Sequence, residues 1–187
     1  MFEKSVEELT ELGAQITTAE IAQQPELWRD TLNIYRENKE AIEAFLAEAR
    51  AMGEGRLSVV FTGAGTSDYV GDTCAPYLRH AGNTDLYDFK PIATTDIVSA
   101  PRDFLRAEDP TLVVSFARSG NSPESLAAVA VAKELVHNVK FLNITCAPEG
   151  KLAVDSADDP NALTLLIPRA NDKGFAMTGS YSCMTLL

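Results

Sequence analysis

Ser119 and Ser122 lie in a glycine-containing loop whose residue types could bind an anion. The loop joins a predicted strand to a predicted helix within residues 113–125, VVSFARSGNSPES. Pro123 suits the first position of that helix, whose first backbone N–H groups have no intrahelical partners and carry the positive end of the helix dipole. Phosphate binds at such helix N-termini, and Gly120 lets the backbone approach a ligand closely. The loop therefore predicts either an anion site or an ordinary turn in which Ser122 only caps the helix.

A second loop of similar composition follows an earlier apolar run, in residues 57–69, LSVVFTGAGTSDY. It is not a dinucleotide fingerprint, because Asp68 stands where the third glycine of G-x-G-x-x-G is needed, and no G-K-[ST] closes either loop as in a P-loop. Both loops follow predicted parallel strands, whose carboxyl ends share one edge of a sheet. Hydroxyls and backbone N–H groups dominate both loops, so we expect one small sugar phosphate there rather than a nucleotide.

Short apolar runs that alternate with helical stretches position these loops. This alternation predicts an α/β fold with a parallel five-stranded sheet flanked by helices. The predicted strands are residues 58–62, 91–94, 111–115, 139–145 and 162–167, and the predicted helices are 68–80 and 122–137, with a short turn at 95–99.

Residues 1–52 form an acidic, helical N-terminal segment in this prediction. Thr17 and Glu20 have the spacing of a capping box, and Pro25 can open a long amphipathic helix. We expect its apolar stripe to pack on the domain formed by residues 53–187, with partner binding as the alternative. Residues 171–187 form another hydroxyl-bearing loop that turns into an apolar helix. We expect this first domain to be incomplete and a second domain to follow it.

The overall charge and the cysteines limit the partners and the compartment. The 187 residues carry a formal charge of −11, which argues against nucleic acid and anionic membranes as partners. The three cysteines show no C-x-x-C spacing, as expected of reduced thiols in the cytoplasm. The first residues do not resemble a signal peptide, and no apolar run reaches the roughly 20 residues of a membrane span.

The two loops together resemble a known family. GAGTS at residues 63–67 and SGNS at residues 119–122 resemble the sugar isomerase (SIS) phosphosugar-binding domain, a match that covers about residues 53–187. ATTDIVS at 93–99, SFARSGNSPES at 115–125 and FAMT at 175–178 resemble the tagatose-6-phosphate ketose/aldose isomerase subfamily, a match that extends through the N-terminal helices. Members of this subfamily are associated with the deamination and isomerisation of galactosamine 6-phosphate.

The resemblance implies a role for three groups of residues and requires neither a cofactor nor a metal. Those expected to bind the sugar or its phosphate are Gly65, Thr66, Ser67, Arg118, Ser119, Gly120, Asn121 and Ser122. Those expected to line the sugar pocket are Phe175, Ala176, Met177 and Thr178, although Gly179 departs from the serine expected next to them. The catalytic base and the ring-opening histidine of SIS isomerases come from a second domain, beyond Leu187. The resemblance also implies a homodimer.

The acid/base candidates within the chain are explained by simpler roles. Asp68 and Glu124 lie in the first turns of predicted helices, whereas His80 and His137 lie at helix ends, and in each place the charge complements the helix dipole. Cys74 and Cys146 are expected to be core residues. The predicted activity is a phosphosugar aldose/ketose isomerase that deaminates galactosamine 6-phosphate. The alternatives are a phosphosugar-sensing domain that regulates a partner, and a partial fold without activity of its own.

Overall fold

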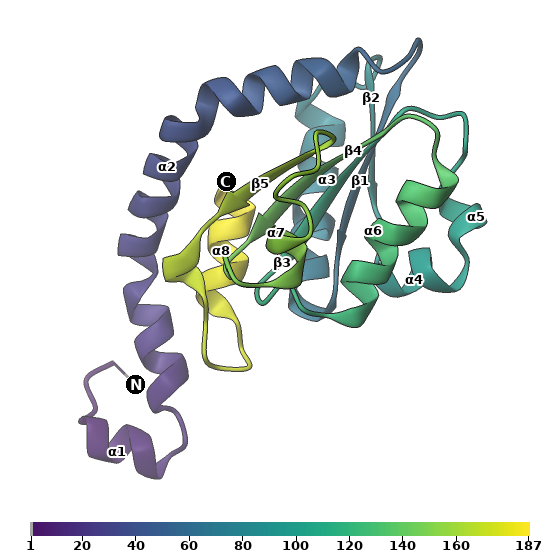
Figure 1. Ribbon diagram of the computed structural model, residues 1–187. Coiled ribbons are helices and arrows are strands. Elements are labelled where there is room, and N and C mark those ends of the chain that lie inside the picture. Colours follow the sequence, from purple (N-terminus) through teal and green to yellow (C-terminus); the bar gives the residue numbers. More distant parts are fainter. Residues whose placement is uncertain (1) are drawn as a thin grey trace.

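Five strands form a single parallel sheet. The computed structural model describes residues 2–187 and orders the strands β2-β1-β3-β4-β5 (Figure 1). The strands are β1 (Leu57–Gly63), β2 (Tyr87–Pro91), β3 (Thr111–Ala117), β4 (Val139–Thr145) and β5 (Ala162–Leu166). Every residue of β1 and β3 is buried, because helices cover both faces of a parallel sheet. The predicted fold class is confirmed.

Helices cover the two faces unequally. Their bounds are α1 (Val6–Glu11), α2 (Gln15–Arg50), α3 (Asp68–Ala81), α4 (Thr94–Ser99), α5 (Pro101–Phe104), α6 (Pro123–Leu135), α7 (Lys151–Val154) and α8 (Thr178–Leu186), with two short 3₁₀ turns, η1 (Gly65–Ser67) and η2 (Pro168–Ala170). One core cluster joins α4 and α6 to one face of the sheet through Ile97, Ala128 and Phe141. A second cluster joins α2, α3 and α8 to the opposite face through Phe45, Val70 and Cys183. None of the helices in residues 2–187 has both the length and the apolar character needed to cross a bilayer.

The second strand lies earlier in the chain than predicted. Register pairs Leu57 with Tyr87 and Phe61 with Pro91, so β2 ends where the prediction of a strand over 91–94 began. Thr94 instead begins α4, and its hydroxyl donates a hydrogen bond of 2.9 Å to the Gly63 carbonyl. The Ile92 N–H still donates a hydrogen bond of 2.9 Å to the Phe61 carbonyl, so contact with β1 ends just after Pro91 and α4 follows at once.

The long helix of the N-terminal segment, α2, also begins earlier than predicted. α2 runs without a break from Gln15 to Arg50, with Pro25 inside it, and Figure 1 shows it as a curved arch beside the sheet. A proline removes one helical hydrogen bond and bends a helix, but packing along a long helix can outweigh that loss. The capping box predicted at Thr17 and Glu20 is wrong, because both residues lie within the helix. The carboxylate of Glu20 has a different use, described below.

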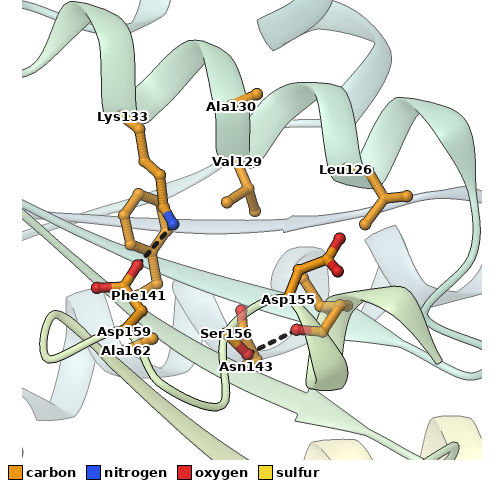
Figure 2. A pocket seen from close by; sticks show the side chains of 11 residues that line it. Leu126, Val129, Ala130, Lys133, Phe141, Asn143, Asp155, Ser156, Asp159 and Ala162 are labelled. Carbon is orange, nitrogen blue, oxygen red and sulfur yellow. Dashed lines mark hydrogen bonds and ion pairs between the residues drawn. The ribbon is translucent and has the colours of Figure 1, made fainter. Parts of the chain in front are cut away.

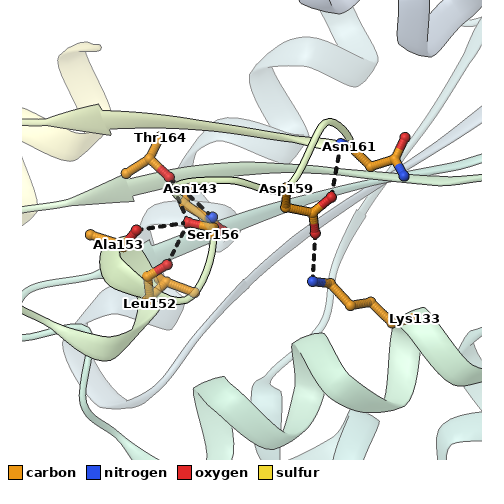
Figure 3. A network of polar contacts seen from close by, with 8 residues as sticks. All are labelled: Lys133, Asn143, Leu152, Ala153, Ser156, Asp159, Asn161 and Thr164. Atoms are coloured by element: carbon orange, nitrogen blue, oxygen red, sulfur yellow. Dashed lines mark hydrogen bonds and ion pairs between the residues drawn. The ribbon is translucent and has the colours of Figure 1, made fainter.

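A half-buried carboxylate near the edge of the sheet gives a stability prediction. The Asp159 carboxylate accepts hydrogen bonds from Lys133 Nζ at 2.5 Å and from the Asn161 N–H at 2.9 Å (Figure 3). The hydrogen bond from Lys133 is the main reason why the pKa of Asp159 lies below its ordinary value. A lowered pKa stabilises the fold above the unfolded value of about 3.9 and ceases to do so as the pH falls through the folded value.

We therefore expect Asp159→Asn to lower the free energy of unfolding by about 1 kcal/mol at pH 7 and by less in acid. Urea unfolding of both proteins at pH 7 and at pH 3 measures the difference. A difference of the same size at both pH values would contradict this assignment.

Candidate functional site

The two glycine-containing loops meet at the carboxyl edge of β1 and β3. They enclose a cavity of about 80 Å³ lined by Ala64, Ser67, Phe116, Ala117, Arg118, Ser119, Ser122, Ser125 and Met177. Pockets that hold drug-sized ligands span roughly 300–1,000 Å³, so this cavity matches a group the size of phosphate rather than a whole hexose phosphate.

The first loop needs glycine for two different reasons. At Gly63, a Cβ atom would lie 2.5 Å from the Ser67 carbonyl carbon and 2.6 Å from the Asp68 nitrogen, so only glycine lets the chain fold back here. Gly65 has a positive φ of 58° with nothing within 4 Å of an added Cβ. Gly65 is exposed and Thr66 half-buried, and neither lines the cavity, whereas Ser67 is buried and does.

The second loop brings its serines to the cavity. Ser122 is the N-cap of α6 and Pro123 is its first residue, but the Ser122 side chain makes no capping hydrogen bond, so its hydroxyl is available to a ligand. Gly120 turns the loop with φ of 64°. Asn121 points elsewhere, because its side-chain oxygen accepts a hydrogen bond of 3.0 Å from the Lys151 N–H, which ties the loop to the start of α7.

Arg118 is the only cationic side chain among the residues that line the cavity. Its Nη1 donates a hydrogen bond of 2.6 Å to the Asp172 carbonyl. Its Nε is buried and has no hydrogen-bond partner within residues 2–187, and the same holds for Ser125 Oγ. Buried polar groups in proteins are nearly always hydrogen-bonded, so these two donors are consistent with a polar ligand or water in the cavity. Ser125 and Asp172 were not predicted, although Ser125 stands within the SFARSGNSPES string.

The structure brings only one residue of the segment 175–178 to the cavity. Met177 lines it and adopts a left-handed conformation, with φ of 48°. Phe175 is 99% exposed and Ala176 is exposed as well. Thr178 is the first residue of α8 and is half-buried. The segment therefore meets the phosphate-sized cavity at one point and leaves its other side chains outside.

Gly179 has a structural reason to differ from the serine expected at its position. Its N–H donates to Asp172 Oδ1 at 3.2 Å, and an added Cβ would lie 2.8 Å from that oxygen. Glycine therefore lets the Asp172 carboxylate reach the backbone at the start of α8.

Among the acid/base candidates, Asp68 has a perturbed environment. Burial raises its pKa, and the nearby carboxylates of Asp72 and Asp96 raise it further. His137 is exposed and pairs with Glu108 at 3.3 Å. Burial, with a smaller contribution from Asp172, raises the pKa of Cys146 to about 12. Cys146 lies in the core, as predicted.

A separate hollow lies between α6, α7 and the edge of the sheet (Figure 2). It has a volume of about 180 Å³ and a largely apolar lining that includes Leu126, Val129 and Phe141. Its lysine, Lys133, already binds Asp159 and lies 5.4 Å from the centre of the Phe141 ring. With its cation already paired, this hollow suits a sugar phosphate less well than the cavity at Arg118.

Comparison with known proteins agrees with the motifs. No family model matches the chain. D-galactosamine-6-phosphate deaminase AgaS of Shewanella sp. (strain ANA-3) is 43% identical over 183 residues, which cover 97% of this chain and 47% of that protein. A candidate D-galactosamine-6-phosphate deaminase AgaS of Streptomyces coelicolor is 48% identical over 172 residues, which cover 91% of this chain and 43% of that protein.

Solved structures agree as well. The crystal structure of a candidate tagatose-6-phosphate ketose/aldose isomerase from Clostridium novyi NT superposes with a TM-score of 0.90 at 44% identity, and covers all of this chain and 46% of that one. The chain thus spans about half the length of the curated relatives it matches. The resemblance read from the motifs is confirmed: the chain is a homologue of the AgaS deaminases and the tagatose-6-phosphate ketose/aldose isomerases and has their SIS fold.

Proposed function

We propose that the cavity at Arg118 binds the phosphate of a hexose 6-phosphate in an aldose/ketose isomerase that deaminates galactosamine 6-phosphate. The observation that carries the proposal is the meeting of Ser67, Ser119, Ser122 and Arg118 around one phosphate-sized cavity at the N-terminus of α6. Positive charge, hydroxyl donors and the end of a helix dipole all favour a phosphate dianion. The names of the relatives, which are D-galactosamine-6-phosphate deaminases, support the choice of substrate.

The reaction begins with the open-chain sugar. A base removes the proton at C2 and O1 takes up a proton, which gives an enolamine. Delivery of a proton to C1 and loss of one N–H proton then leave an alcohol at C1 and an imine at C2. Water then hydrolyses the imine to the ketone of tagatose 6-phosphate and releases ammonia. The residues of this chain hold the phosphate and thereby orient C1 and C2, a contribution of binding energy made far from the reacting atoms. The other residues that the resemblance assigns to the site would lie outside the phosphate cavity, except Met177, which lines it; they are Gly65, Thr66, Gly120, Asn121, Phe175, Ala176 and Thr178.

The catalytic base is expected from a second SIS domain, which would pack with residues 53–187. A groove of about 460 Å³ between the sheet and the helices α2, α3 and α8 supports this arrangement, since its lining is mainly apolar and includes the half-buried Leu78 and Leu187. The greater length of the relatives supports it too. The N-terminal segment would belong to the same folded unit as the first domain, since α2 packs on the sheet and on α8 through Leu27, Phe45 and Ala49.

A homodimer in the cytoplasm completes the proposal. Leu32, Tyr35 and Leu46 of α2 are large apolar side chains that remain exposed in this chain, and the three cysteines are free thiols. Light scattering of the natural protein at micromolar concentration measures its mass, and a monomeric mass would remove the dimer from the proposal.

Turnover tests the activity. The natural full-length protein is expected to release one ammonia for each tagatose 6-phosphate formed from galactosamine 6-phosphate, and to leave unphosphorylated galactosamine unchanged. Binding of the phosphosugar without turnover, across amino and neutral hexose 6-phosphates, would favour the sensor alternative. Absence of both binding and turnover would overturn the proposal.

A further inference from the structure

Asp172 is a buried carboxylate that joins three parts of the candidate site. Its side chain is 2% exposed. Oδ1 accepts a hydrogen bond of 3.2 Å from the Gly179 N–H, and Oδ2 accepts one of 2.7 Å from the Ser180 N–H. Its backbone carbonyl accepts the hydrogen bond of 2.6 Å from Arg118 Nη1. One residue therefore contacts the first turn of α8 with its side chain and the cation of the cavity with its main chain.

The geometry ties the direction of Arg118 to the position of Asp172. A guanidinium has five donors in one rigid plane, so a short hydrogen bond at Nη1 restricts where the other donors lie. Nε is buried and lacks a partner within residues 2–187. The carbonyl can hold the guanidinium only if residue 172 keeps its place, and the two hydrogen bonds from α8 to the Asp172 carboxylate help to fix it there.

A second buried carboxylate holds the same segment from the other side. Glu20 of α2 accepts hydrogen bonds from the Lys173 N–H at 2.7 Å and the Gly174 N–H at 3.0 Å. The chain from Asp172 to Gly174 is thus clamped between α2 and α8, next to the segment that carries Met177 to the cavity. This clamp also explains why Glu20, in the middle of a helix, is buried.

We propose that Asp172 is a positioning residue, which holds the Arg118 guanidinium in place to bind the substrate phosphate. The inference rests on the proposed function, because it needs a phosphate at Arg118. The competing explanation is that Asp172 only caps α8, in which case its loss would affect folding and binding independently of Arg118.

A double-mutant cycle separates these explanations, with inorganic phosphate as the probe and calorimetry of the natural full-length protein as the measurement. Asp172→Asn keeps the size of the side chain, but an amide has only one oxygen and cannot accept both N–H hydrogen bonds as the carboxylate does. We expect it to weaken phosphate binding about tenfold, which corresponds to the loss of roughly one charge-assisted hydrogen bond. In the Arg118→Met background, the same substitution is expected to change the affinity less than about twofold, because a positioning residue acts only through its partner.

Gly179→Ala is the second variant, in case Asp172→Asn folds poorly. This variant keeps the Asp172 carboxylate, but the added Cβ atom would lie only 2.8 Å from Asp172 Oδ1 and would push the carboxylate away from α8. It is expected to weaken phosphate binding with Arg118 present and to have little effect without it. Asp159→Asn is the matched control, since this acid also accepts two hydrogen bonds but lies away from the cavity; its phosphate affinity is expected to stay at the wild-type value.

The outcomes distinguish this inference from the proposed function. If wild-type protein binds phosphate and either Asp172→Asn or Gly179→Ala weakens binding equally with and without Arg118, Asp172 is structural and the inference is overturned. If wild-type protein does not bind phosphate or phosphosugar, the proposed site fails and the inference fails with it. Asp172→Asn with unaltered affinity would also overturn the inference.

Discussion

Replacing Ser119 and Ser122 together with alanine is expected to weaken the binding of phosphate and of galactosamine 6-phosphate by about 100-fold or more. Each serine would donate a hydrogen bond to a charged phosphate, and such bonds contribute about 1.5–3 kcal/mol each, which corresponds to roughly tenfold or more apiece. Calorimetric titration of wild type and variant with both ligands measures the loss.

The same double variant is expected to lose little stability. The Ser122 side chain makes no capping hydrogen bond, and the Ser119 hydroxyl accepts only a bond of 3.3 Å from the Asn121 N–H. The free energy of unfolding in urea should fall by about 1 kcal/mol at most, within the range of an ordinary partly exposed substitution.

Ser5→Ala is the matched control for this experiment. Ser5 forms the capping box with Glu8 at the start of α1, far along the chain from the cavity. Its loss should cost about 0.5–2 kcal/mol of stability with unaltered phosphate affinity. Equal effects of the double variant on binding and on folding would show that Ser119 and Ser122 are only a turn and a cap.

Gly63→Ala is expected to have the largest effect on folding of the substitutions in the two loops. The new Cβ would lie 2.5–2.6 Å from backbone atoms of Ser67 and Asp68. Backbone atoms cannot move away from such a clash as easily as the end of a flexible side chain can. Overpacking of this kind costs about 1–3 kcal/mol, and relief by movement of Ser67 would also weaken phosphate binding. Urea unfolding and phosphate titration measure the two effects.

Two other glycines serve as comparisons for this variant. At Gly65, alanine meets nothing within 4 Å but must adopt a φ of 58°, at a cost of about 1–2 kcal/mol. At Gly53, alanine meets only the Pro110 side chain at 3.3 Å and should be nearly neutral. If Gly65→Ala or Gly53→Ala destabilises the protein more than Gly63→Ala, the close approach at Gly63 is not the dominant constraint.

The sequence predicted the sheet well because its strands are buried on both faces. Runs such as 111–117 are mainly apolar and have no competing helical period. The prediction failed at β2, where polar residues such as Asp88 and Lys90 weaken the apolar signal and the boundary depends on pairing with β1. It also failed at the start of α2, because Thr17, Glu20 and Pro25 carry local start signals that tertiary packing overrides.

The candidate site, too, could be predicted from the sequence only in part. Its loops could be found from sequence because a strand, a glycine turn and a helix start lie close together in the chain, and this local order fixes Ser119, Ser122 and Arg118 at one edge of a parallel sheet. Asp172 could not be found, because it stands 54 residues from Arg118, beyond two further strands. Nothing near Asp172 in the chain indicates that its carbonyl meets a guanidinium.

What the sequence determined by itself is therefore the fold class, the two glycine-containing loops and the resemblance to phosphosugar isomerases, since each depends on patterns of residues that are close together in the chain. Only the tertiary structure decided which of those residues share the cavity, why position 179 is glycine, and that Glu20 and Asp172 hold the segment beside it. These depend on distances between segments far apart in the chain, and burial makes such contacts strong because an unpaired carboxylate or N–H group inside a protein is costly.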